Sequence, residues 1–276
     1  MDLKRKNLLV VGGSGGLGAS AARTFLRLGA RVAVTGRRPE KIEAAQSWLG
    51  NNGLAMQCDA SDSSQTEKVF SRVLDVFGEL HGVYHVAGGS GRSFGDGPLH
   101  EITDEGWRKT LGLNLDSVFY SNRAAIRCFL KQKNGGAILN CGSVLGSSPS
   151  PRFFATHAYA VAKSAMIGMN RSLAAHYADN GIRINLICPG LVATPMSERA
   201  QTDASIMGYI QSKQPLDGGR IGMPEDLDEA AAFLLSDAAN FITGQVLSVD
   251  GGWGVSEGSF PESVPGHSPS DGCKTD

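Results

Sequence analysis

Short apolar segments alternate with amphipathic segments along most of the 276-residue chain. Between the first two apolar segments, Leu17, Ala21, Phe25 and Leu28 recur at three- and four-residue intervals, the spacing of one helical stripe. Seven apolar segments are short enough to be buried strands: residues 7–11, 31–35, 53–58, 82–87, 137–141, 182–188 and 245–249. The alternation predicts an α/β fold, a doubly wound parallel sheet of about seven strands with helices on both faces.

No segment that resembles a linker interrupts this alternation before residue 252, so we expect one domain over residues 1–252. The composition changes after that point. From Ser256 to Asp276, eleven of the twenty-one residues are Gly, Ser or Pro, which is typical of chain that buries little apolar surface. Residues 253–276 are therefore predicted to form a mobile tail, or alternatively an arm that lies across a neighbouring subunit.

The charges are balanced, with 26 basic and 27 acidic side chains and a net charge of −1. No basic block beyond residues 4–6 offers a footprint for nucleic acid or a membrane surface, so neither partner is expected. The five cysteines are scattered and odd in number, which favours reduced core thiols in a cytoplasmic protein and gives no metal site. We see no export signal and no apolar run of about 20 residues that would span a membrane.

A glycine-rich turn follows the first predicted strand and precedes the first predicted helix, the context in which such a turn binds a dinucleotide. Missing side chains let the backbone approach a pyrophosphate at the helix N-terminus. The spacing fits two patterns, G-x-x-x-G-x-G and G-x-G-x-x-G, and does not choose between them. The predicted contacts are Gly12, Ser14, Gly15, Gly16, Leu17 and Gly18.

The second predicted strand ends in Thr35-Gly-Arg-Arg, where a fold selective for NAD usually places an acid against the ribose 2′-hydroxyl. Here Arg37 and Arg38 stand instead, and a guanidinium pairs well with a 2′-phosphate. The sequence therefore predicts NADP(H) rather than NAD(H). The alternative is two solvated arginines on a loop.

Tyr159 and Lys163 lie four positions apart in a helical segment, so the phenol and the ammonium share one face. A fixed positive charge nearby favours the phenolate, and the ammonium together with a bound cationic cofactor is expected to lower the tyrosine pKa toward neutrality. Such a pair can move a proton at physiological pH. By itself the spacing is more typical of a packed phenol beside a solvated lysine.

Together with the glycine turn, this pair makes the chain resemble the short-chain dehydrogenase/reductase family, in particular its single-domain members of about 250 residues such as the 3-oxoacyl reductases. The resemblance runs from about residue 5 to residue 252 and implies a Rossmann fold. The further motifs that carry it are Cys58-Asp59, Ala87-Gly88, Leu113-Asn-Leu115, Ser143, Pro189-Gly-Leu-Val-Ala-Thr-Pro195 and Val249-Asp-Gly-Gly252.

The resemblance implies a catalytic tetrad. Tyr159 would be the general acid or base, and Lys163 would lower its pKa and hold the nicotinamide ribose. Ser143 would polarise the substrate carbonyl, and Asn114 would anchor a proton-relay water. Preorganised donors of this kind suit the developing charge on a reacting oxygen.

The same resemblance implies further cofactor contacts. Asp59 and Ala60 would lie near the adenine, and the residues after the fourth strand would follow the ribose. Besides Tyr159 and Lys163, these contacts are Asp59, Ala60, Ala87, Gly88, Gly89, Pro189, Gly190, Val192 and Thr194. Two simpler interpretations remain open: Asp59 caps the next helix, and Asn114 is an ordinary polar helix residue.

Three features depart from the family pattern. His85 and Val86 stand where the family usually has Asn-Asn before Ala-Gly, so two bracing side chains are lost. Sixteen positions separate Ser143 from Tyr159 instead of the usual thirteen, with the extra residues within 147–154. The loop 88–97 is unusually rich in glycine and is either a mobile wall of the substrate cleft or a solvated excursion.

The region between Thr194 and Pro224 contains apolar side chains and corresponds to a substrate lid in the family, which suggests a partly hydrophobic substrate. These side chains are Met196, Met207, Tyr209 and Ile210. Phe153, Phe154 and His157 form the opposite wall, or else the two aromatic rings belong to the core. No cluster of basic residues is visible for a phosphorylated or acyl-carrier substrate.

The sequence therefore predicts an NADP(H)-dependent oxidoreductase that transfers hydride between nicotinamide and a carbonyl or secondary alcohol. The alternatives are a non-catalytic NADP(H)-binding sensor of the same fold, and an epimerase or dehydratase, whose usual larger C-terminal domain is missing here. The resemblance implies a homotetramer or, failing that, a dimer, and small residues on the long helices suit close packing between subunits. These residues are Ala158, Ala162, Ala165 and Ala174.

Overall fold

Seven parallel strands form a single sheet in the computed structural model, which describes residues 2–259. Their order across the sheet is β3-β2-β1-β4-β5-β6-β7. The strands are β1 Asn7–Val11, β2 Arg31–Gly36, β3 Gly53–Gln57, β4 Gly82–His85, β5 Gly136–Cys141, β6 Ile182–Pro189 and β7 Val246–Val249. The predicted α/β fold is confirmed, and each predicted strand boundary lies within two residues of the observed one.

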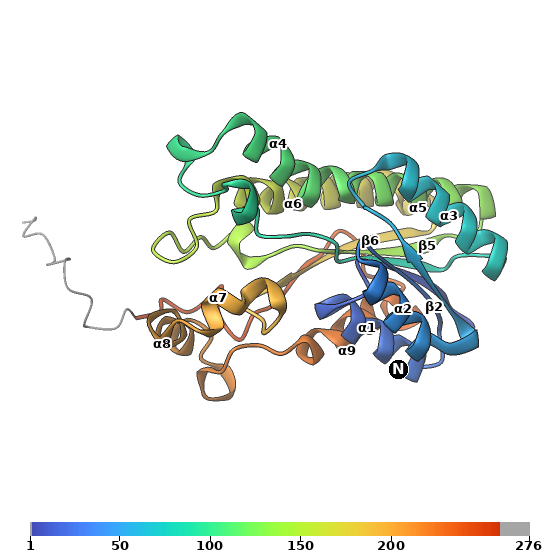
Figure 1. The fold of residues 1–276 in the computed structure, drawn as a ribbon. Helices are drawn as coiled ribbons and strands as arrows, with labels where there is room; N and C mark the ends of the chain where they lie inside the picture. Colours follow the sequence, from blue (N-terminus) through green and yellow to red (C-terminus); the bar gives the residue numbers. More distant parts are fainter. Residues whose placement is uncertain (1, 260–276) are drawn as a thin grey trace, which may run out of the picture.

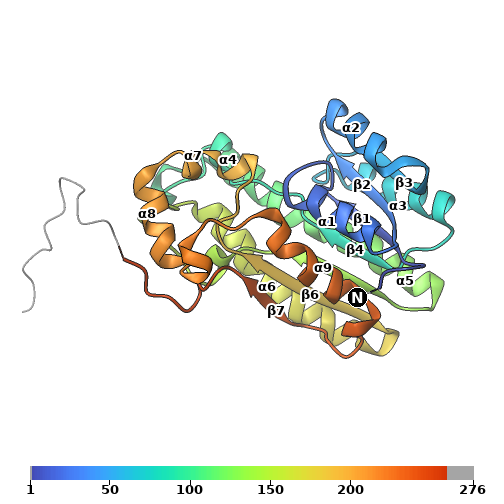
Figure 2. The ribbon, with the colours of Figure 1, turned by 90° about the horizontal axis from the view of Figure 1, so that it is seen from below.

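Helices cover both faces of the sheet (Figure 1). The helices α3, α4, α5 and α6 lie on one face, and α1, α2 and α9 lie on the other. Figure 2 shows α1 and α9 side by side against the sheet, while α7 and α8 extend beyond its end. The bounds are α1 Gly16–Arg27, α2 Pro39–Leu49, α3 Ser63–Phe77, α4 Asp104–Leu111, α5 Ser117–Gln132, α6 His157–Tyr177, α7 Glu198–Gln201, α8 Ala204–Lys213 and α9 Asp228–Leu235.

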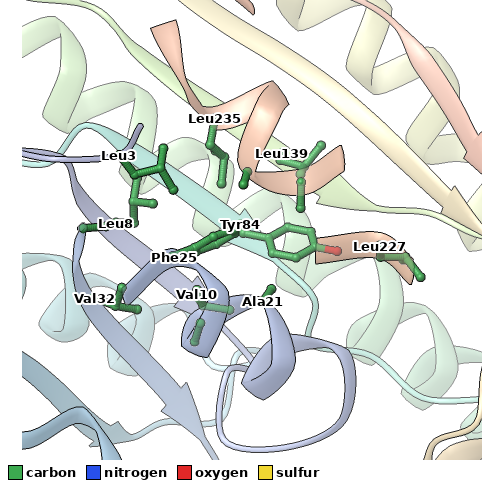
Figure 3. Packing of buried hydrophobic residues seen from close by; sticks show 14 of the residues in the cluster. Leu3, Leu8, Val10, Ala21, Phe25, Val32, Tyr84, Leu139, Leu227 and Leu235 are labelled. Carbon is green, nitrogen blue, oxygen red and sulfur yellow. The ribbon is translucent and has the colours of Figure 1, made fainter. Parts of the chain in front are cut away.

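The two largest apolar clusters of the core lie on opposite faces of the sheet. On the face covered by α1 and α9, Phe25 packs beside Tyr84 and close to Leu139 (Figure 3). On the other face, Phe70 and Phe129 belong to a second cluster with the sheet residues that point that way. Full burial on both faces explains why the central strands are continuous apolar runs without polar alternation.

The chain changes direction across the sheet at β1. This strand pairs with β2 on one side and with β4 on the other, so the loops after β1 and β4 leave toward opposite faces. A crevice forms at such a reversal, at the carboxyl ends of the strands, and it is the usual ligand site in an open α/β sheet. The glycine-rich turn after β1 and the segment after β4 are therefore neighbours.

Chain just beyond residue 252 packs onto the domain. Trp253 is 1% exposed, and its indole Nε1 donates a hydrogen bond of 3.1 Å to the Ser148 carbonyl oxygen. The Lys213 ammonium donates to the Ser256 carbonyl oxygen. Most of the predicted mobile tail, residues 260–276, lies outside the described residues.

Four cysteines, Cys58, Cys128, Cys141 and Cys188, are buried free thiols, as expected for reduced core cysteines. Burial raises the pKa of the Cys58 thiol to about 11, so it stays protonated. Within residues 2–259, no helix has the length and apolar character needed to cross a membrane, and no cluster of metal-binding side chains occurs.

Candidate active site

The glycine-rich turn between β1 and α1 depends on missing side chains. Gly12 has φ +91°, and a Cβ on it would lie 2.6 Å from the Ala87 amide nitrogen. A Cβ on Gly18 would lie 2.5 Å from the Gly12 carbonyl oxygen, which lets α1 approach the turn. Gly16 also has positive φ, at +50°. The strained positions favour the G-x-x-x-G-x-G interpretation of the spacing.

The first turn of α1 fits an anionic group. Its N-cap, Gly15, forms no side-chain cap, and the first turn contains no acidic residue. The first amides of a helix have no hydrogen-bond partner within the helix, and they lie at the positive end of its dipole. A Cβ on Gly15 would meet no atom within 4 Å, so the space in front of these amides is open. A dinucleotide pyrophosphate matches this cradle in charge and in hydrogen bonding.

Arg37 and Arg38 follow β2 and are exposed at the edge of the same crevice. Arg38 lies 3.7 Å from the Glu40 carboxylate, with 66% of its side chain exposed. The Ser14 hydroxyl lies against Gly36, so closely that a Cβ on Gly36 would overlap it. A serine hydroxyl and two exposed arginines are therefore found where β2 ends.

Asp59 lies after β3 and does not cap the next helix. Its carboxylate accepts hydrogen bonds from the Ser61 amide at 3.0 Å and from the Ser61 hydroxyl at 2.7 Å. The cap of α3 is Asp62, whose side chain accepts from the amides of the first turn. These amides and the Ser64 hydroxyl lower the pKa of Asp62 to about 2. The capping interpretation of Asp59 is therefore wrong.

Tyr159, Lys163 and Ser143 meet at the carboxyl end of β5. Ser143 follows this strand and is 9% exposed, while Tyr159 and Lys163 lie one turn apart near the start of α6. The Ser143 hydroxyl accepts from the Leu145 amide at 3.2 Å and lies near enough to the Tyr159 phenol to lower its pKa. The Lys163 ammonium lies 5.6 Å from the centre of the Tyr159 ring. The longer spacing between Ser143 and Tyr159 therefore does not keep their side chains apart.

Burial dominates the electrostatics at Tyr159 in the chain by itself. It raises the pKa of the Tyr159 phenol above its ordinary value, and the nearby Ser143 hydroxyl opposes this only in part. Desolvation of the phenolate thus costs more than its polar neighbours return. The lowered pKa that the sequence predicts depends on Lys163 together with a bound cationic cofactor and stays a prediction.

Lys163 is held in a buried position. It is 5% exposed, and its ammonium donates a hydrogen bond of 2.7 Å to the Cys141 carbonyl oxygen. Burial lowers the pKa of its side chain. A Cβ on Gly88 would lie 3.8 Å from the Lys163 ammonium nitrogen, so the lysine reaches the turn after β4. The ammonium therefore lies between the phenol and the predicted ribose contacts.

Asn114 is fully buried in the π-helical turn Gly112–Asp116, between α4 and α5. Its side-chain oxygen accepts from the Gly89 amide at 3.0 Å, and its amide nitrogen donates to the Gly89 carbonyl oxygen at 2.9 Å. The same nitrogen donates to the Thr110 carbonyl oxygen. Its side chain thus clamps the turn after β4 and is not an ordinary solvated helix residue.

His85 holds the turn after β4, although the loss of the two asparagines usual in the family was expected to weaken this turn. Its ring Nε2 lies 3.1 Å from the Ala87 carbonyl oxygen, and its Nδ1 lies 2.7 Å from the Ser121 hydroxyl. One neutral tautomer satisfies both contacts, with Nε2–H donating and Nδ1 accepting. Burial, followed by the Lys163 charge, lowers the pKa of His85 to about 3. The ring therefore ties the turn to α5.

The glycine-rich loop 88–97 is packed against the catalytic helix through a residue that the sequence did not identify. Asp96 is 5% exposed, and its carboxylate accepts from the Ala158 amide at 3.0 Å and from the Tyr159 amide at 2.9 Å. The residue at the N-cap of α6, Thr156, forms no side-chain cap. Asp96 thus caps α6 across 62 positions of sequence, so the loop is not a solvated excursion.

The loop after β6, from Pro189 to Thr194, is fixed by Gln214 at the end of α8. The Leu191 amide donates to the Gln214 side-chain oxygen at 2.5 Å, and the Gln214 amide nitrogen donates back to the Leu191 carbonyl at 3.2 Å. A Cβ on Gly190 would lie 2.6 Å from the same side-chain oxygen. Thr194 approaches Gly16, which brings this loop to the dinucleotide cradle.

The aromatic residues near the site belong to a third apolar cluster. The rings of Phe153 and Tyr209 lie 5.2 Å apart between centres, and those of Phe154 and Trp253 lie 5.8 Å apart. Tyr209 is 4% exposed and Ile210 is fully buried, so much of the apolar content of the expected lid is core. The core interpretation of the two phenylalanines is favoured over a cleft wall. His157 is exposed.

Most of the alanines expected at a subunit interface are buried within the chain. Ala158 and Ala162 are fully buried, and Ala174 is 2% exposed. Only Ala165 of the four faces outward. The reasoning from these alanines was wrong because they let α6 approach its own sheet, which a sequence pattern does not distinguish from contact with another subunit.

Comparisons with known proteins find relatives over most of the chain. A family profile described as enoyl-(acyl carrier protein) reductase matches residues 12–254. The chain is 33% identical to the 2,5-dichloro-2,5-cyclohexadiene-1,4-diol dehydrogenase of Sphingobium indicum, over 91% of this chain and 98% of that protein. It is also 33% identical to the 3-oxoacyl-(acyl-carrier-protein) reductase of Escherichia coli, with the same coverage.

The fold gives the same result. A short-chain type dehydrogenase/reductase from Mycobacterium ulcerans superposes with a TM-score of 0.85 at 33% identity, covering 93% of this chain and 92% of that one. Sequence identity and fold thus agree over nearly the whole described domain. The chain belongs to the short-chain dehydrogenase/reductase family of oxidoreductases.

Proposed function

We propose that this protein is an NADP(H)-dependent oxidoreductase that interconverts a carbonyl group and a secondary alcohol on a partly apolar substrate, with Tyr159 as the general acid and base. The observation that carries the proposal is the meeting of Ser143, Tyr159 and Lys163 beside the glycine cradle. When bound, the nicotinamide ring supplies or accepts the hydride.

Tyr159 holds the proton that the carbonyl oxygen receives during reduction. Burial raises the pKa of the phenol, so the protonated form that reduction requires is the dominant one at neutral pH. The Ser143 hydroxyl, close to the phenol, donates to the same substrate oxygen as negative charge develops on it. Lys163 stabilises the phenolate that remains and lies close enough to the turn after β4 to hold a ribose hydroxyl.

The turn after β4 is the second part of the cofactor site. Asn114 fixes Gly89 with two hydrogen bonds, and His85 fixes the Ala87 carbonyl oxygen. The loop from Pro189 to Thr194 lies on the other side of the crevice. Both walls are thus held by buried polar side chains, which orients bound cofactor without reorganisation.

The preference for NADP(H) rests on Arg37, Arg38 and Ser14. A hydrogen bond between charged groups contributes roughly 1.5 to 3 kcal/mol, so Arg37→Ala is expected to weaken NADPH binding about 10- to 100-fold and to leave NADH binding unchanged. Lys41→Ala, an exposed cation one turn further on, is the matched control. Equal dissociation constants for NADPH and NADH in the parent protein would refute the preference.

Tyr159→Phe tests the proton transfer. The variant is expected to bind NADPH as the parent does and to lose carbonyl reduction at least 1,000-fold, since donation by a positioned acid contributes about 10²- to 10⁴-fold. Tyr177→Phe, at the other end of the same helix, is the control. Tight NADPH binding by the parent with no turnover on a broad ketone panel would favour the non-catalytic sensor instead.

The relatives do not define the substrate. A chlorinated cyclohexadienediol dehydrogenase and an acyl-carrier-protein reductase are equally similar to the chain. For the assembly, we propose a homo-oligomer through the outer faces of α5 and α6, where Phe119 and Val161 are each 46% exposed. Light scattering is expected to give a dimer or tetramer mass, and Phe119→Glu with Val161→Glu is expected to reduce it to that of a monomer.

A further inference from the structure

Three segments around the catalytic residues converge on one backbone oxygen, the carbonyl of Phe153. The Arg92 guanidinium, from the loop before α4, donates to it at 3.4 Å. The Arg199 guanidinium, from α7, donates to it at 3.1 Å. Phe153 itself lies in the loop that leads into α6. In Figure 1, the loop before α4 and the helix α7 lie on opposite sides of this loop.

The two guanidinium groups lie close enough to repel each other. The Arg199 charge lowers the pKa of Arg92, in addition to the larger effect of burial, and the Asp96 carboxylate opposes both. That carboxylate is already engaged by the Ala158 and Tyr159 amides. Among residues 2–259, neither arginine forms an ion pair with a carboxylate. A neutral carbonyl oxygen does not balance two positive charges.

This position lies near the proposed catalytic residues. Arg92 lies four positions before Asp96, whose carboxylate accepts a hydrogen bond from the Tyr159 amide. Arg199 follows Thr194, at the cofactor loop, by five positions. Phe153 packs in the same apolar cluster as Val144, which adjoins Ser143. A substrate with its reacting carbon at Tyr159 would therefore extend toward the two arginines.

We propose that Arg92 and Arg199 form a binding site for an oxyanion group of the substrate, a carboxylate or a phosphate, at the end remote from the reacting carbonyl. This proposal rests on the proposed function and narrows it to acidic carbonyl compounds. An oxyanion between the two guanidinium groups receives charge-assisted hydrogen bonds and removes their mutual repulsion. The site was invisible in the sequence because its two arginines are 107 positions apart.

A pair of ketones that differ only in charge tests the site. The probes are 4-oxocyclohexanecarboxylate and its neutral methyl ester, and dihydroxyacetone phosphate against dihydroxyacetone distinguishes phosphate from carboxylate. Binding is measured by calorimetry on the NADP⁺-loaded protein, and kcat/KM is measured with NADPH. The parent is expected to favour at least one charged member over its neutral partner by 10-fold or more.

The double variant Arg92→Gln with Arg199→Gln is expected to reduce that ratio to about 1 while leaving the neutral ketone unchanged. Arg72→Gln, an exposed arginine on α3, is the control. Equal binding of charged and neutral members by the parent would overturn the proposal. An equal loss of binding and kcat/KM for the charged and the neutral ketone in the double variant would also overturn it. That result is expected if the two arginines only hold the Phe153 loop in place.

Failure of the proposed function is a separate result. If no ketone is reduced but the charged probe still binds more tightly, the anion site stands and the oxidoreductase assignment falls. If neutral ketones are reduced normally and charge has no effect on binding, the anion site falls and the oxidoreductase assignment stands.

Discussion

The aspartate that caps the catalytic helix gives the sharpest test of how this site is built. Asp96 accepts hydrogen bonds from the Ala158 and Tyr159 amides at 3.0 and 2.9 Å, and it is 5% exposed. Asp96→Ala leaves both amides without a partner and removes a negative charge from the positive end of α6. We expect this variant to be less stable and less active.

The magnitude follows from two contributions. Loss of a side-chain cap costs about 0.5 to 2 kcal/mol, and loss of a charge at a partly buried helix terminus costs about 1 kcal/mol more. The sum is roughly 2 to 3 kcal/mol, which corresponds to a fall in Tm of about 5 to 10 °C for a domain of this size. Asp96→Asn keeps one acceptor and is expected to lie between the parent and the alanine variant.

Urea unfolding followed by circular dichroism measures the stability, and NADPH oxidation with a reactive ketone measures kcat. Asp62→Ala is the matched control, because Asp62 caps α3 through two amides in the same way but far from Tyr159. It is expected to lower stability without changing kcat. A urea midpoint for Asp96→Ala equal to that of the parent would refute the capping argument, and an unchanged kcat would refute the link to catalysis.

Three further changes follow from buried polar groups. The pKa of His85 is about 3 in the fold and about 6.5 in an unfolded chain. Stability therefore falls as pH drops from 6 toward 4, by up to about 1.4 kcal/mol per pH unit. His85→Asn should flatten this dependence of stability on pH in urea titrations, and His157→Asn should not. Burial raises the pKa of Asp228, and one of its carboxylate oxygens has no hydrogen-bond partner among the described residues. The stability that the protonated carboxyl contributes to the fold is therefore lost as pH rises through its pKa in the folded state. Asp228→Asn should therefore raise the urea midpoint at pH 7 more than at pH 4. Trp253→Phe removes the hydrogen bond to Ser148 and part of a buried ring, and should cost roughly 1 to 3 kcal/mol in urea unfolding.

Local patterns in the sequence were enough for the fold and for the centre of the site. The five strands between the edge strands β3 and β7 are short, mostly buried apolar runs, which is why the run and the strand coincide within two residues. Tyr159 and Lys163 are one helical turn apart, so their common face follows from spacing alone. The glycine turn lies between a strand and a helix as predicted, and backbone angles at Gly12 and Gly16 distinguish the two possible spacings.

Contacts between distant segments were not predictable in this way. Asp96 reaches α6 across 62 positions, and Trp253 reaches the Ser148 carbonyl across 105. Neither residue belongs to a periodic pattern, because each has one partner that only the folded topology brings near. The same limit applies to Ala158 and Ala162, since a small residue suits contact with the chain's own sheet as well as contact with another subunit.

The raised pKa of the Tyr159 phenol connects the distant Asp96 contact with proton transfer at the proposed site. Asp96 places a negative charge at the N-terminus of α6 and so opposes the positive helix end, which would otherwise favour a phenolate nearby. Burial acts in the same direction by raising the pKa of the phenol. Lys163 then remains as the buried cation beside the ring, and it is held by the Cys141 carbonyl oxygen. The chain by itself therefore keeps the proton on Tyr159, and the charge of an oxidised nicotinamide would add to that of Lys163 when the proton has to leave. Under the proposed function, a phenol that is protonated before the substrate arrives can donate its proton when a carbonyl is reduced.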